Sequence, residues 1–102
     1  MSPSTPSREL LLAKNGWYSN QLTTLIDSML YLNMFTGEQL AAAHDELIVV
    51  SRNTYMLNRQ ENLLYINQQE RLNRIKQDSR YQAYIRDKYQ FMERHMANIA
   101  RE

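Results

Sequence analysis

The forty residues from Thr36 to Ile75 contain one glycine, Gly37, at the start and no proline. Thr36 and Gln39 have the spacing of a capping box, in which each side chain bonds the backbone of the other residue. Because no Gly or Pro follows Gly37, nothing in the stretch forces a helix to end. The sequence therefore predicts one long helix over about residues 37–76.

The whole chain of 102 residues contains two Gly and two Pro, and both prolines lie in the first six residues. Strands and hairpins need turn residues that are missing here, so we expect an all-α protein. Residues 1–7 are predicted to be a flexible N-terminal leader and residues 8–102 a single helical domain. Its expected helices are about 8–15, 17–34, 37–76 and 79–100. Gly16 is expected to end the first, and the alternative is that this helix runs on with a slight kink at Gly16.

Apolar residues at alternating spacings of three and four predict coiled-coil-like packing between 17–34 and the first half of the long helix. The turn at Thr36 and Gly37 is short, so these two segments should form an antiparallel helical hairpin. The predicted hairpin core comprises Trp17, Leu22, Leu25, Met29, Leu40, Leu47 and Val50.

The second half of the long helix is richer in amides, with eight Asn or Gln between residues 58 and 77. One interpretation is that a polar residue at a seam position, among Glu61, Gln68 and Arg71, specifies helix register and oligomer state; the other is a solvated helix face with a few apolar contacts. Further on, Ser79 and Gln82 repeat the capping-box spacing. We therefore favour a break or kink after Asp78 and a separate amphipathic C-terminal helix; the alternative is that the long helix runs straight through.

The sequence offers little for catalysis. It has no cysteine, so disulfides and thiolate chemistry are excluded. Neither His44 nor His95 has a metal-ligating residue four positions later, and no Gly-rich phosphate loop is present. We expect no enzyme, no cofactor and no metal.

The longest apolar runs have four residues and the N-terminus is polar, so a cytoplasmic protein without a membrane span is expected. Signal-less export would leave the same pattern.

The C-terminal segment carries a stripe of Tyr, Met and Ile, residue types suited to an adaptable protein interface. The predicted partner-binding residues are Tyr81, Tyr84, Ile85, Tyr89, Met92 and Met96. The favoured function is a non-enzymatic protein–protein interaction module, such as a small helical chaperone, adaptor or regulator. Its partner would be another protein or a second copy, giving a dimer or other homo-oligomer. The open alternative is a monomeric bundle in which the stripes bury one another.

A nucleic-acid-binding regulator is the alternative function. Residues 1–50 carry two basic and five acidic residues, net −3, whereas residues 51–102 carry ten basic and six acidic ones, net +4. Basic side chains interleaved with tyrosines can bind phosphate and stack on bases. Acidic residues interrupt this face, and the isoelectric point of about 8.0 is low for such a role. The candidate nucleic-acid residues are Arg52, Arg59, Arg71, Arg74, Lys76, Arg80, Arg86 and Lys88.

Overall fold

The computed structural model describes residues 7–57 and 62–101, and these are almost entirely helical. The helices are α1 (Arg8–Tyr31), α2 (Gly37–Leu57), α3 (Asn62–Gln77) and α4 (Ser79–Arg101). No strand occurs among the described residues, so the predicted all-α class is confirmed. The proposed leader falls mainly in residues 1–6, which lie outside the described part.

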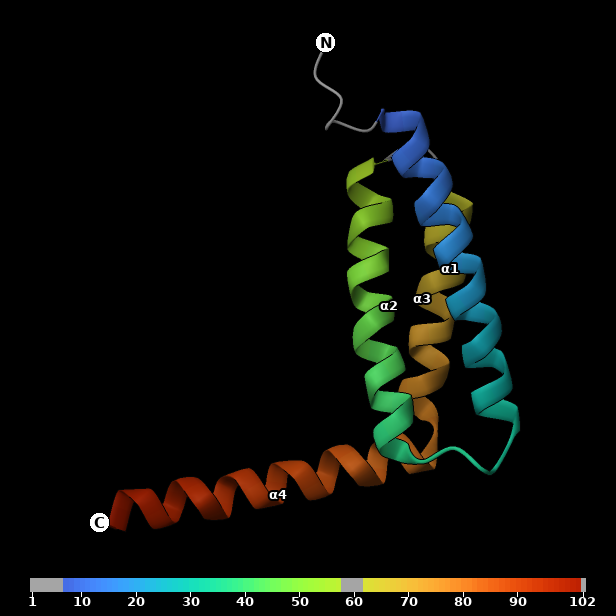
Figure 1. Cartoon of the computed structure of the whole chain (residues 1–102). Helices are drawn as coiled ribbons and strands as arrows, with labels where there is room; N and C mark the ends of the chain where they lie inside the picture. The colour runs from blue at the N-terminus through green and yellow to red at the C-terminus, as the bar shows by residue number, and fades with distance from the viewer. Residues whose placement is uncertain (1–6, 58–61, 102) are drawn as a thin grey trace.

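Helices α1, α2 and α3 lie side by side and alternate in direction, forming a three-helix bundle (Figure 1). Helix α4 leaves the base of this bundle as an arm at a steep angle to the bundle axis (Figure 1). The molecule accordingly measures 59 Å by 37 Å by 23 Å along its principal axes. The fold thus consists of a packed body and a projecting helix.

The apolar core occupies the half of the bundle nearest the arm. It forms where α1 and α2 pack against the last turns of α3, and Tyr81 at the start of α4 packs against its edge. Burying such side chains stabilises the fold by about 1.5–3 kcal/mol each. The buried core residues are Leu22, Ile26, Met29, Leu40, Ala43, Leu47, Val50, Leu72 and Ile75.

A buried polar layer replaces the apolar core in the other half of the bundle. The Gln68 amide is fully buried and donates to Ser19 Oγ and to Thr54 Oγ1, both at 2.8 Å. Asn15 donates to the same Thr54 hydroxyl at 2.6 Å. One amide on α3 therefore bonds both α1 and α2, which favours the interpretation that Gln68 specifies register.

The predicted rod over 37–76 is wrong, because α2 and α3 pack against each other instead of forming one helix. Helix α2 ends at Leu57 and α3 begins at Asn62, and residues 58–61 lie outside the described part. Folding back lets α3 bury Leu72 and Ile75 and lets the Gln68 side-chain NH2 group donate its hydrogen bonds. Tertiary burial of this size exceeds the small free-energy gain of continuing α2 as one longer helix.

Three details of the expected hairpin also differ. Helix α1 runs unbroken through Gly16, since one glycine costs only about 1 kcal/mol in a helix that packs along its length. It ends at Tyr31, three residues earlier than expected. Trp17 and Leu25 are 66% and 50% exposed and do not belong to the core. The buried face of α1 runs through Ser19, Leu22, Ile26 and Met29 instead.

The capping box at the start of α2 is present. Gln39 N donates to Thr36 Oγ1 at 3.2 Å, and Thr36 N donates to Gln39 Oε1 at 2.8 Å. The break before α4 is present too, but Ser79 is not its cap. Asp78 caps α4, because its carboxylate accepts from Arg80 N at 2.9 Å. The negative charge of a carboxylate at this position also interacts favourably with the positive end of the helix dipole, and an uncharged serine hydroxyl lacks this interaction.

Candidate interaction surface

The joint between the bundle and the arm is held by the Arg80 side chain. Its guanidinium donates to the Met29, Leu30, Leu32 and Phe35 carbonyls at 2.9–3.3 Å. The first three of these carbonyls lie at the C-terminal end of α1, where helical carbonyls lack partners within the helix, and the Phe35 carbonyl lies in the connection to α2. A cation at the end of α1 also interacts favourably with the negative end of the helix dipole. Arg80 therefore caps α1 while belonging to the first turn of α4.

The Asp78 carboxylate completes this joint. It accepts from Arg80 Nε at 3.0 Å and from Arg80 Nη2 at 2.9 Å, and both side chains are mostly buried. These hydrogen bonds lower the pKa of Asp78 from its ordinary value of 3.8 and outweigh burial, which raises it. The joint therefore requires Asp78 in its ionised form.

This requirement gives a pH prediction. Because the pKa of Asp78 is lower in the folded than in the unfolded chain, its contribution to stability is complete above pH 3.8. It is lost as pH falls from there through the lower, folded pKa. Denaturant unfolding at a series of pH values from about 6 to about 2 should show this loss. Asp78→Asn keeps a capping side chain and should flatten that part of the curve; a variant as acid-sensitive as the wild type would contradict the assignment.

The first turns of α4 pack directly on the start of α2. A Cβ atom placed on Gly37 would lie 2.0 Å from the Arg80 carbonyl oxygen and 2.9 Å from Tyr84 Cβ. Further along α2, the His44 ring lies against the Tyr81 ring, with centroids 5.3 Å apart. His44 is 6% exposed, and burial raises the pKa of Tyr81. Backbone contact and ring packing therefore fix where the arm leaves the body.

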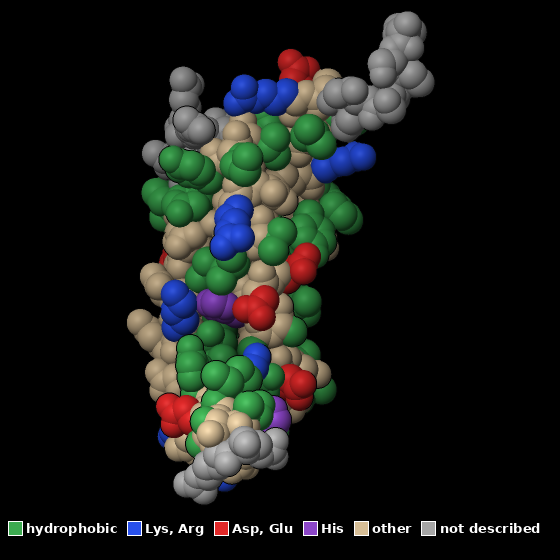
Figure 2. All heavy atoms as spheres, turned by 90° about the vertical axis from the view of Figure 1, so that its left-hand side faces the viewer, with side chains coloured by type: hydrophobic (Ala, Val, Ile, Leu, Met, Phe, Trp, Pro, Cys, Tyr) green, Lys and Arg blue, Asp and Glu red, His purple; other side chains and the backbone are tan. Residues whose placement is uncertain are grey.

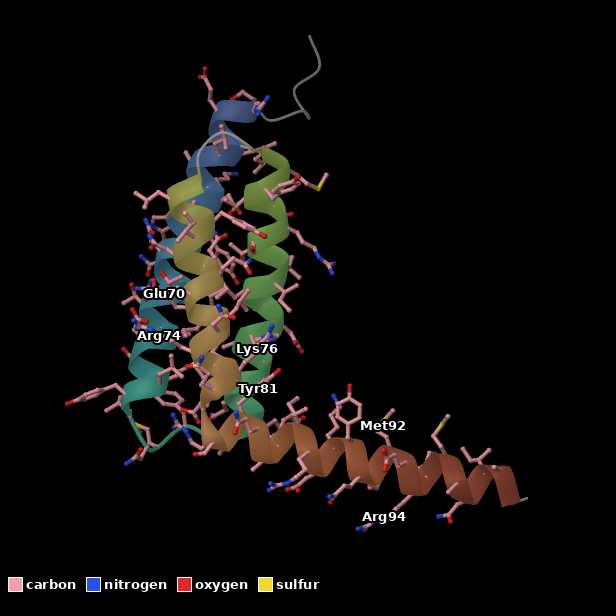
Figure 3. The ribbon with its side chains drawn as sticks, turned by 180° about the vertical axis from the view of Figure 1, so that it is seen from behind. Glu70, Arg74, Lys76, Tyr81, Met92 and Arg94 are labelled. Atoms are coloured by element: carbon pink, nitrogen blue, oxygen red, sulfur yellow. The ribbon has the colours of Figure 1, made fainter. Side chains whose placement is uncertain are left out.

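Beyond these turns, α4 carries one apolar stripe that the bundle does not cover. Four of its large side chains are half or more exposed, namely Tyr89 67%, Met92 53%, Met96 64% and Ile99 56%, and Ile85 at its start is partly buried. Figure 3 shows Met92 on the side of the arm from which the bundle rises and Arg94 on the opposite side. We call the residues Ile85, Tyr89, Met92, Met96 and Ile99 the α4 stripe.

Four residues of the α4 stripe, Ile85, Tyr89, Met92 and Met96, line an open groove of about 600 Å³. Two charged side chains also line this groove: Lys88 and Glu93. Helical spacing places them on opposite edges of the stripe, since they lie four residues before and one residue after Met92. An apolar groove with one basic and one acidic edge can receive a helix whose charges are arranged in the complementary way.

The sequence-predicted partner residues divide between two roles. Ile85, Tyr89, Met92 and Met96 line the groove together. Tyr81 and Tyr84 are half-buried in the joint instead, where they face His44 and Gly37. Sequence reasoning left Glu93 out of the surface and placed Lys88 only on a nucleic-acid face. Their spacing from Ile85 and Met92 was the signal that could have placed both at the groove.

The candidate nucleic-acid residues are spread over α2, α3 and α4, and several are engaged within the chain. Arg71 forms a two-bond ion pair with Asp27 at 3.2 Å, and Arg74 pairs with Glu70 at 2.8 Å. Arg80 belongs to the joint, and Arg86 lies 3.8 Å from Asp87. Arg59 lies outside the described residues. The remaining basic side chains are Arg52 and Lys76, at a groove between α2 and α3, and Lys88.

Figure 2 views the molecule from the side toward which α4 projects. Hydrophobic side chains cover much of this side, and single Lys or Arg and Asp or Glu side chains separate them (Figure 2). Within the described residues, no three His, Asp or Glu side chains cluster in a way that could hold a metal ion. None of the described helices is both long and apolar enough to cross a lipid bilayer.

Comparison of the chain with models of protein families, with curated proteins and with solved structures finds no match.

Proposed function

We propose that the protein is a non-enzymatic interaction module that binds a partner helix along the α4 stripe. This role suits a small helical chaperone, adaptor or regulator. The observation that carries the proposal is that α4 keeps the apolar side chains of its stripe from Tyr89 to Ile99 half or more exposed, over about three turns, while the bundle beside it has a packed core of its own. A helix of this length gains most of its stability from packing an apolar face, so an uncovered face of Met, Tyr and Ile points to a partner.

The build of the joint supports this role. A helix that was flexibly attached to the bundle would have no fixed direction. Arg80, Asp78 and Gly37 instead hold α4 at one angle, with the stripe on the bundle side of the arm. A pre-positioned helix loses less conformational entropy when it binds, which raises affinity. The flexible thioether side chains of Met92 and Met96 allow the surface to repack around a helix.

The experiment compares two aspartate variants on opposite sides of the arm. Met92→Asp places a charge in the stripe, whereas the matched control Arg94→Asp changes the solvent side. Both sites are exposed, so both variants should keep a folded bundle by circular dichroism. Tagged wild-type and Arg94→Asp chains should retain the same proteins in a pulldown, and Met92→Asp should lose them by tenfold or more. Equal retention by all three chains would contradict the proposal.

A further inference from the structure

We propose that the helix bound by α4 is α4 of a second copy of this chain, paired in antiparallel orientation. This inference rests on the proposed function and names its partner. The spacing of the α4 stripe supports it. Residues 85, 89, 92, 96 and 99 follow one another at intervals of four, three, four and three. This alternation is the seam of a two-stranded coiled coil, in which both helices present the same pattern.

Opposite charges beside the seam can pair between two copies of the helix. Arg86 and Glu93 each follow a seam residue directly, lie on the same edge and are seven residues apart. In an antiparallel pair, like edges face each other, so Arg86 of each copy meets Glu93 of the other copy. The symmetry produces this attraction twice. On the other edge, Lys88 meets His95 of the second copy, and no two acids are brought together.

The position of the bundle selects the antiparallel orientation. Tyr81 lies four residues before Ile85, on the same line as the α4 stripe, and α2 already covers it through His44. The bundle rises from the side of the arm that carries the stripe (Figure 3). A parallel second helix would begin where this bundle stands, and the two bundles would collide. An antiparallel second helix begins at the free end of the arm and places the bundles at opposite ends.

The size of the surface sets the expected affinity. The seam covers fifteen residues, which corresponds to about 22 Å of helix. A standard stable interface buries about 800 Å² on each partner, and a seam of two heptads lies at or below that size. We therefore expect dissociation constants in the micromolar range, so that the dimer forms and separates with concentration.

The first test measures molar mass against concentration by sedimentation equilibrium. The wild-type chain should pass from 12.2 kDa to twice that mass as its concentration rises. Met92→Asp should stay at the monomer mass at the concentration where the wild type is mostly dimeric, and Arg94→Asp should dimerise like the wild type. A wild-type mass that remains 12.2 kDa up to about 1 mM, where even weak complexes form, would overturn the proposal. So would a Met92→Asp variant that dimerises normally.

The second test reports orientation, and the absence of native cysteine makes it direct. Ile85→Cys and Met96→Cys chains are prepared separately, mixed and oxidised. In the antiparallel pair, residue 85 of one copy faces residue 96 of the other, so the mixture should form mainly the mixed disulfide. Rapid self-crosslinking of each variant alone would show parallel pairing and overturn the orientation.

The two proposals fail separately. If the chain stays monomeric while the pulldown still separates Met92→Asp from Arg94→Asp, the α4 stripe binds a different protein and self-association is wrong. If the chain dimerises through the stripe and wild type and variants retain the same other proteins, self-association stands and the stripe has no further partner.

Discussion

Arg80→Met is expected to lower the free energy of unfolding by about 3 kcal/mol, since it removes charged hydrogen bonds and leaves a mostly buried carboxylate without its cation. The Arg80 guanidinium bonds three carbonyls at the end of α1, the Phe35 carbonyl in the connection to α2 and the Asp78 carboxylate. Methionine keeps much of the apolar length of the side chain but none of these donors. Urea denaturation followed by circular dichroism measures the loss.

Two controls make this result specific. Arg74→Met removes an exposed ion pair with Glu70 in which the partners are four residues apart, and it should cost only about 0.5 kcal/mol. Arg80→Lys keeps the charge, but its compact ammonium cannot reach all four carbonyls and the carboxylate together. It should therefore recover less than half of the loss. If Arg80→Met and Arg74→Met lower the free energy of unfolding equally, Arg80 contributes no more than an exposed ion pair and the joint is held by other contacts.

The helical class was predictable because it depends on local chemistry. Strands and tight turns need Gly, Pro and similar residues, and this chain has almost none after its first six positions. The cap at Thr36 and Gln39 was predictable for the same reason, since both partners lie within one turn. The break after Asp78 also had a local signal, although the capping residue was misassigned by one position.

The path of the chain was not predictable from local signals. No glycine or proline marks the reversal between α2 and α3, so the sequence read as one rod. The reversal is favoured by contacts between distant residues, such as Gln68 with Ser19, forty-nine positions apart. Ser19 itself is fully buried. Because serine is polar, the sequence did not indicate it as a core residue, and the predicted core of α1 included Trp17 and Leu25 instead.

The candidate surface was predictable in part. Four of the six predicted partner residues line the groove on α4, because an amphipathic helix displays its stripe in the sequence. The joint determines which end of the stripe is buried against the bundle of the same chain. Arg80 looked like one more basic side chain on a charged face, and its role as the cap of α1 requires the ends of two helices to meet in space.

Gly37→Ala is the second large effect that we expect, and its sign is the informative part. In an ordinary helix, alanine is more stable than glycine by about 1 kcal/mol. At Gly37 the added Cβ would lie 2.0 Å from the Arg80 carbonyl oxygen and 2.7 Å from its carbon, which are backbone atoms. Helix α4 must therefore move away from α2 as a unit. We expect a loss of about 2–3 kcal/mol, at the upper end for overpacking.

Gly16→Ala is the matched control, because Gly16 lies within α1 and nothing stands within 4 Å of the added Cβ. It should stabilise the protein by about 0.5–1 kcal/mol, so the two glycine variants should shift the urea midpoint in opposite directions. Limited trypsin digestion locates the damage in Gly37→Ala, since an undocked α4 should be cut at Arg86 or Lys88 before the bundle is cut. If both variants are stabilised, α4 does not pack on α2 as described. The direction of the arm, on which antiparallel pairing depends, would then have to be set by other contacts.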